Sequence, residues 1–192
     1  MTRAGRALVT REDYFGAAMA LLAADGPSAL TLGRLCGAVG VTSGSFYHHF
    51  AGVDGFVGAL LEHWEAEQTR RIREVVEASA DPWERVSVLK HLGAALPHRA
   101  EAAIRAWAAA DAVVGRAQRR VDAERTDGLR VVAAGVGVPP AVASRLARLG
   151  VALLAGAQQT GCPDEPAVVL ELFGDLEDLV RAHATLPAPE RR

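Results

Sequence analysis

The sequence predicts an all-helical protein with a small N-terminal domain of three helices and a larger C-terminal helical domain. Apolar residues recur along most of the chain at spacings of three and four, and no segment alternates as a half-buried strand does. Several expected helices begin at a proline and end before a glycine, as helix termini favour. Of the 192 residues, 50% are hydrophobic but only 5% are aromatic, a composition suited to closely packed helices.

The first helix is expected to begin after Thr10 and to end at Asp25-Gly26-Pro27. Thr10 is an N-cap candidate because its hydroxyl can accept a hydrogen bond from an unpaired backbone amide. Residues before Thr10, among them Arg3 and Arg6, are expected to form a mobile arm. The buried face of this helix is expected to comprise Tyr14, Phe15, Ala18, Leu21 and Leu22.

Two short helices joined by a glycine turn are expected between Thr31 and Phe50. Thr31 is the N-cap candidate of the first helix, and Thr42 is that of the second. Gly40 stands where a helix ends in a left-handed residue, a conformation that glycine adopts without strain. The apolar stripe of the first helix consists of Leu32, Leu35, Cys36 and Val39. This pattern predicts a helix-turn-helix unit.

The second short helix carries side chains suited to a DNA groove, while Phe46 and Phe50 are expected to point into the core. Its hydroxyl groups can contact base edges or phosphates, and its tyrosine and histidines can donate to phosphate oxygens. Phosphate contacts position a protein and base contacts specify the sequence, so the helix has candidates for both. The candidate DNA-contacting residues are Thr31, Thr42, Ser43, Gly44, Ser45, Tyr47, His48 and His49.

The string GVTSGSFYHHF, preceded by ALTLGRLCGAV, resembles the recognition motif of the TetR family of transcriptional regulators. The resemblance covers Arg11 to Leu61. It implies a helix-turn-helix DNA-binding domain over residues 1–50, a ligand-binding and dimerisation domain over residues 51–185, and a disordered tail over residues 186–192. It also implies a transcriptional repressor. Such a protein binds palindromic double-stranded operator DNA as a dimer, and a small, mostly apolar effector releases the protein from the DNA.

Two departures from the family pattern concern phosphate contacts. The family commonly has a lysine where this chain has Ser43, and another where it has Val53. Each lost phosphate contact flattens the log–log salt dependence of binding by about one unit. The first fifty residues contain four arginines and three acidic residues, a weak positive footprint for a DNA-binding domain. The alternative is therefore a TetR-like small-molecule-binding protein with weak or lost operator binding.

A long helix is expected from Asp54 to about Ala78, and it can transmit motion between the two domains because it reaches both. Five further helices are expected at Pro82–Leu96, Pro97–Ala109, Asp111–Gly135, Pro139–Gly161 and Glu165–His183. The last two carry broad apolar faces, which suggests more than one buried side. The resemblance implies a four-helix homodimer interface through them, which would place two recognition helices about one DNA turn apart.

The family resemblance also implies an effector pocket in the second domain. Ligand sites are mostly apolar with a few placed polar groups, and the apolar helices here supply such residues. The candidate ligand-binding residues are Leu61, Trp64, Val86, Leu89, Trp107 and Leu153.

Composition and missing motifs exclude other classes of function. The formal net charge of −2 argues against a non-specific polybasic binder. Neither a signal peptide nor an apolar run of about 20 residues stands out, so a soluble cytoplasmic protein is expected. Cys36 and Cys162 alone predict neither a disulfide framework nor a metal site. The sequence lacks GxSxG, Walker and HExxH motifs, so no enzyme and no cofactor are expected.

Overall fold

The computed structural model describes residues 9–77, 79–160 and 166–187, and every regular element in them is a helix. The predicted all-helical fold class is confirmed. Expectations for the N-terminal arm, Ala78, Gly161, Cys162 and Glu165 lie outside the described residues, as does the tail beyond residue 187. The elements are α1 (Arg11–Asp25), the short 3₁₀ helix η1 (Pro27–Ala29), α2 (Leu32–Val39), α3 (Ser43–His49), α4 (Val53–Glu77), α5 (Pro82–Ala94), α6 (His98–Ala108), α7 (Ala112–Gly135), α8 (Pro140–Gln159) and α9 (Pro166–His183).

Helix α1 begins at a complete capping box. The Asp13 amide donates to the Thr10 hydroxyl at 3.3 Å, and the Thr10 amide donates to the Asp13 carboxylate at 2.8 Å. These reciprocal bonds satisfy two of the amides that a helix start leaves unpaired. The hydrogen bond from the Thr10 backbone amide, followed by that from the Thr10 hydroxyl, lowers the pKa of the Asp13 carboxyl group. The predicted start of α1 is thus confirmed together with its cap.

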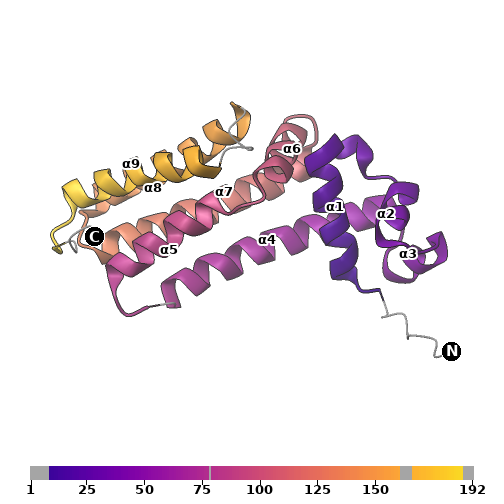
Figure 1. Ribbon diagram of the computed structural model, residues 1–192, viewed down its shortest axis with the longest axis horizontal. Coiled ribbons are helices and arrows are strands. Elements are labelled where there is room, and N and C mark those ends of the chain that lie inside the picture. The colour runs from indigo at the N-terminus through magenta and orange to yellow at the C-terminus, as the bar shows by residue number, and fades with distance from the viewer. Residues whose placement is uncertain (1–8, 78, 161–165, 188–192) are drawn as a thin grey trace.

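The molecule is elongated, with α1, α2 and α3 gathered at one end and α5, α7, α8 and α9 stacked towards the other (Figure 1). The long helix α4 runs below α5 and α7 and continues into the end formed by α1, α2 and α3 (Figure 1). Its N-terminal half buries Phe56, Leu60 and Trp64 in a first hydrophobic core, and its C-terminal half buries Val75 in a second. The expected role of this helix as a connector therefore has a physical basis, because it is part of both cores.

The first core crosses the boundary predicted at residue 50. It combines the buried faces of α1–α3 with Leu61 of α4, Ile104 of α6 and Val114 of α7. Helix α6 also packs extensively against α1. The helix-turn-helix unit is therefore joined to the rest of the chain through shared apolar burial rather than through a linker.

The later helices follow the expected order with small shifts at their ends. Helix α5 ends at Ala94 rather than Leu96, and Pro97 is the N-cap of α6 rather than its first residue. Leu186, expected to open a disordered tail, instead donates its backbone N–H to the carbonyl oxygen of Val136 at 3.1 Å. This anchor ties the chain after α9 to the end of α7.

Helix α8 is, among the described residues, the one helix long and apolar enough to cross a membrane by length and composition alone. The sequence was expected to contain no apolar run of that length, and α8 is interrupted by Arg145 and Arg148. A third of the tested window is buried inside the protein, since α8 packs against α7 and α9. A core helix of a soluble protein passes the same test, so this feature is weak evidence for a membrane.

Candidate nucleic-acid interface and ligand cavity

The turn between α2 and α3 is built as the sequence predicts. The Arg34 amide donates to the Thr31 hydroxyl at 3.4 Å, which caps α2. Gly40 is left-handed (φ 75°, ψ 36°), and the following amide of Val41 donates to the Cys36 carbonyl at 3.0 Å. This hydrogen bond closes the helix end and fixes the direction in which the chain enters α3.

Helix α3 is held on the domain by an aromatic cluster. Phe46 is fully buried, and its ring lies 5.6 Å from that of Tyr14 and 5.7 Å from that of Phe56. Phe50 packs edge-on against the same Tyr14 ring, with 5.5 Å between centroids. Because one side of α3 is anchored in this way, its other side is held outward in a fixed orientation.

Most of the candidate DNA-contacting side chains lie on that outer side. Tyr47 is 60% exposed, whereas Ser45 and His49 are half-buried, with the His49 ring 5.8 Å from that of Tyr14. The Thr31 hydroxyl is exposed, but it already accepts the capping hydrogen bond of α2. The other exposed candidates are Thr42, Ser43, Gly44 and His48.

Thr42 occupies the N-cap position of α3 without acting as a side-chain cap. Its backbone is extended (φ −84°, ψ 161°), and its carbonyl accepts from the Ser45 amide at 3.1 Å. Within the described part of the chain, no capping hydrogen bond reaches its hydroxyl. The predicted N-cap is therefore correct in position but not in its hydrogen bond, and the hydroxyl stays available for another partner.

The positive charge of this domain is small, because its four arginines stand against three acidic residues. Arg34 pairs with the Asp25 carboxylate, and the Arg11 guanidinium lies over the Phe50 ring at 5.0 Å from its centroid. Ser43 is exposed at the outer start of α3, and Val53 is half-buried at the start of α4. The outer face of α3 thus offers hydroxyl, phenol and imidazole groups rather than ammonium groups.

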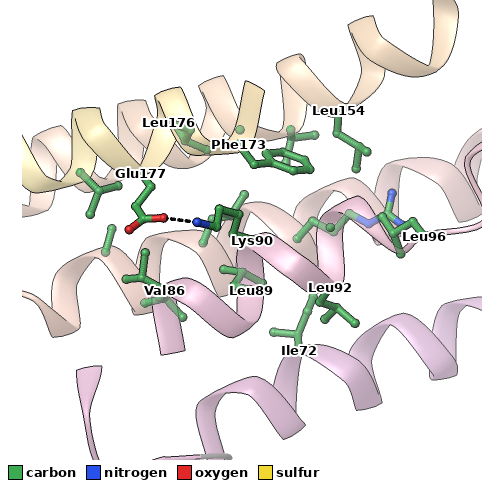
Figure 2. A pocket seen from close by; sticks show the side chains of 18 of the residues that line it. Ile72, Val86, Leu89, Lys90, Leu92, Leu96, Leu154, Phe173, Leu176 and Glu177 are labelled. Carbon is green, nitrogen blue, oxygen red and sulfur yellow. Dashed lines mark hydrogen bonds and ion pairs between the residues drawn. The ribbon is translucent and has the colours of Figure 1, made fainter. Parts of the chain in front are cut away.

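A cavity lies between α4, α5, α7, α8 and α9, and encloses about 850 Å³ including its opening to solvent. Its lining is mostly aliphatic, with Phe173 as its aromatic residue (Figure 2). Lys90 on α5 and Glu177 on α9 form an ion pair across it, with 2.6 Å between Nζ and Oε2 (Figure 2). A mostly apolar lining with a few charged groups is the polarity of small-molecule sites.

Two of the six candidate ligand-binding residues, Val86 and Leu89, line this cavity. Leu61 and Trp64 are instead buried in the first core, and Trp107 packs against that core. Leu153 packs against the second core without lining the cavity. The structure thus divides the six residues between two cores. Helical periodicity indicates that they are buried, but it does not indicate in which core.

Sequence reasoning missed a buried polar layer that lies where the two cores meet. Arg125 of α7 donates through Nη2 to Glu101 of α6 at 2.6 Å and to Gln68 of α4 at 2.8 Å. The other Glu101 oxygen accepts from Gln158 of α8 at 2.9 Å. We call these four residues the polar layer. Since Glu101 is 1% and Arg125 7% exposed, removing one partner would cost about 3–5 kcal/mol by stranding a buried charge.

An adjoining ion pair extends the polar layer. Arg105 of α6 binds both oxygens of Asp122 on α7, at 2.8 and 3.0 Å, and reaches Gln158 at 3.3 Å. The layer therefore joins α4, α6, α7 and α8. The only sequence signal for it was a set of polar and charged residues placed on otherwise apolar helix faces.

The two helices expected at a dimer interface keep part of their apolar surface exposed. Leu146 of α8 and Leu176 of α9 are buried within the protomer, at 8% and 6% exposure. Leu149 and Leu179 remain 39% and 42% exposed. Leu176 is thus a core residue of the protomer, and the outward face is marked by Leu149 and Leu179.

Comparison with known protein families matches residues 15–60 to the N-terminal domain described as "Bacterial regulatory proteins, tetR family". A curated relative, the HTH-type transcriptional repressor KstR2 of Mycobacterium tuberculosis, is 34% identical over 86 residues. That match covers 45% of this chain, and the chain spans only 43% of the relative's length. The matched family domain contains most of α1, then η1, α2, α3 and the start of α4.

Solved structures share the fold over nearly the whole chain. A transcriptional regulator from Rhodococcus sp. Rha1 superposes with a TM-score of 0.74 at 20% identity, covering 94% of this chain and 100% of its own. A TetR transcription regulator from Haloarcula marismortui gives 0.73 at 18% identity, with 91% and 98% covered. A TetR-family regulator from Streptomyces coelicolor gives 0.72 at 20% identity, with 90% and 95% covered. At these identities the likeness establishes the fold.

Proposed function

We propose that this chain, whose N-terminal domain is that of the TetR family of bacterial regulators, is a ligand-responsive transcriptional repressor. In this proposal it binds palindromic operator DNA in the cytoplasm as a homodimer. The observation that carries it is the outer face of α3, where Tyr47 is 60% exposed while Phe46 anchors the helix in the core. An anchored helix with exposed hydroxyl and phenol groups can enter a major groove in one orientation. The name of the KstR2 relative, a transcriptional repressor, favours repression.

The outward faces of α8 and α9 support the proposed dimer, through the segments Pro139–Gly161 and Glu165–His183. Leu149 and Leu179 are large apolar side chains that would lose their remaining exposure in a four-helix interface. Exposed Arg145 and Arg148 lie on α8, and exposed Asp175 lies on α9. In a two-fold interface the same patch meets itself, so the arginines of one protomer can face the carboxylates of the other.

The cavity supports a small, mostly apolar effector. Helix α4 contributes Ile72 to its lining and Phe56 to the first core, and α6 is joined to α7 by the polar layer while packing against α1. A ligand that shifts α4 or α6 would therefore alter the position of the DNA-binding unit. Such an effect is limited by the ligand's differential affinity for the two arrangements, typically about 1–3 kcal/mol.

A fluorescence-anisotropy titration with DNA from upstream of the coding sequence tests the proposal. We expect a dissociation constant of about 10⁻⁸ M or lower, and a preference of at least about a thousandfold over scrambled DNA. Equal affinity for both DNAs would contradict it.

The effector part has a separate test, which begins with a thermal-shift screen of metabolites. For any molecule that binds, operator DNA must weaken ligand binding by the same factor by which the ligand weakens operator binding. A ligand bound equally well with and without saturating operator would show that the cavity is not an induction site.

The second candidate is a TetR-like small-molecule-binding protein with weak or lost operator binding. The observation that favours it is the small positive charge of the domain, with Arg34 paired to Asp25 and serine and valine at the positions of the usual lysines. The salt dependence of DNA binding separates the candidates. A log–log slope near zero would favour this second function, because each phosphate contact contributes about −0.9.

A further inference from the structure

One donor in the polar layer is left without a partner. Arg125 lines the cavity, and its Nη2 makes both hydrogen bonds to Glu101 and Gln68. Among the described residues, nothing accepts a hydrogen bond from its buried Nη1. A buried guanidinium N–H without an acceptor is costly. Its position on a mostly apolar cavity therefore indicates that a ligand atom supplies the missing acceptor.

The guanidinium group of Arg125, rather than the net charge of the lining, indicates the nature of that acceptor. Arg71, Lys90 and Arg125 are positive, and Glu177 is the negative lining residue. Glu67 and Glu101 pair with Arg71 and Arg125, so these charges nearly balance and the unpaired N–H of Arg125 is what indicates an acceptor. A carboxylate matches a guanidinium N–H in geometry and makes the stronger, charge-assisted hydrogen bond.

We propose that the cavity binds an amphipathic monocarboxylic acid whose apolar body lies among its aliphatic residues and whose carboxylate accepts from Nη1 of Arg125. This inference rests on the proposed function, since it names the chemical class of the effector. It goes beyond the proposed function by naming Arg125 as the group that recognises the effector.

The other cations of the lining are already engaged. Lys90 binds Glu177 at 2.6 Å, and Arg71 binds Glu67 at 3.0 Å. Each of these side chains is also more exposed than Arg125. A ligand that used Lys90 would first have to break an ion pair between α5 and α9, whereas Nη1 of Arg125 has no partner to lose and needs only the side chains that cover it to move aside.

The first test compares three ten-carbon probes on the wild-type protein by isothermal titration calorimetry at neutral pH, below their micellar concentrations. We expect decanoate to bind at least about tenfold more tightly than 1-decanol, because a hydrogen bond to a charged group is gained. Decylamine, a cation at this pH, should bind most weakly. Equal affinities for decanoate and decanol, or no binding of decanoate, would overturn the proposal.

The second test removes the charged pair as a unit, so that no buried charge is stranded. In the double variant Glu101→Gln/Arg125→Met, decanoate should fall to the affinity of 1-decanol, while decanol itself changes by less than about threefold. The matched control, Lys90→Met/Glu177→Gln, removes the other charged pair of the cavity and should keep the preference for decanoate. A preference that survives the first variant, or disappears in the control, would contradict recognition by Arg125.

A folding control and a second variant keep the test valid if the double variant does not fold. Circular dichroism establishes whether each variant is folded; if the double variant is not, Arg125→Lys with Glu101 intact replaces it. Lysine keeps the charge but loses the second guanidinium nitrogen, so decanoate should weaken more than decanol. Because these titrations contain no DNA, failure here leaves operator binding intact, and failure of operator binding leaves the probe preference intact.

Discussion

Leu179→Ala should weaken the proposed dimer by an amount that follows from its exposure. Full burial of a leucine side chain contributes about 1.5–3 kcal/mol, and Leu179 still has 42% of its surface exposed in the protomer. An interface that buries this exposed part gains about 0.6–1.2 kcal/mol from the Leu179 side chain of each protomer. A two-fold dimer contains two copies, so the substitution should raise the dimer dissociation constant roughly 10- to 50-fold.

Leu179→Glu should act more strongly, because it places two carboxylates in an apolar interface where each costs several kcal/mol. Sedimentation velocity at micromolar concentration should then report a monomer with unchanged circular dichroism. The matched control is Val113→Glu on α7, at a residue that is 52% exposed but lies outside α8 and α9. If Leu179→Glu remains dimeric, or if Val113→Glu dissociates equally, the assignment of the interface is wrong.

Three further predictions concern the recognition helix, pH and packing. Tyr47→Phe should weaken DNA binding about equally for all sequences, whereas Ser45→Ala should reduce discrimination at one base pair by about 1 kcal/mol; anisotropy with a set of singly substituted operators distinguishes them, and an unchanged preference for Ser45→Ala would exclude base readout there. Burial alone would raise the pKa of Glu177, but hydrogen bonds from Lys90 and Arg181 lower it overall. The stability it contributes is thus complete above its unfolded pKa of about 4.3 and is lost as pH falls through the lower folded value, so urea unfolding of Glu177→Gln should depend less on pH in the acid range. Gly150→Ala should cost up to about 2 kcal/mol, because the new Cβ would lie 2.9 Å from a Leu176 methyl carbon and overpacking outweighs helix propensity; the control Gly16→Ala meets nothing within 4 Å and should gain stability in the same assay.

Local signals in the sequence were sufficient for the helix ends and the turn. The caps at Thr10 and Thr31 and the left-handed Gly40 depend on residues within four positions of one another, so a short window contains all of their determinants. The burial of Phe46 and the exposure of Tyr47 followed from the same short-range pattern. The ends of α5 and α6 were shifted by one or two residues. The error at the cap of α3 arose because a suitable hydroxyl at the N-cap of so short a helix does not have to bind back to it.

Long-range partners could not be predicted in this way. Arg125 meets Glu101, 24 residues away, and Gln158 lies 57 residues from the same Glu101. Nothing local to these residues identifies those partners. For the same reason the sequence could not separate Trp64, in the first core, from Val86, at the cavity. Both are apolar residues on amphipathic helices, and only the packing of α4 against α5 and α7 decides their positions.

Hydroxyl-radical footprinting of the wild-type protein on DNA from upstream of its coding sequence tests most directly whether this chain is a dimeric operator-binding protein that reads DNA through α3. We expect two protected half-sites that are related by two-fold symmetry. Their centres should lie about one helical turn, or a multiple of it, apart. We also expect Tyr47→Phe to weaken the protection of both half-sites together. A uniform cutting pattern at protein concentrations that saturate a specific site, or protection of one unpaired half-site, would contradict it.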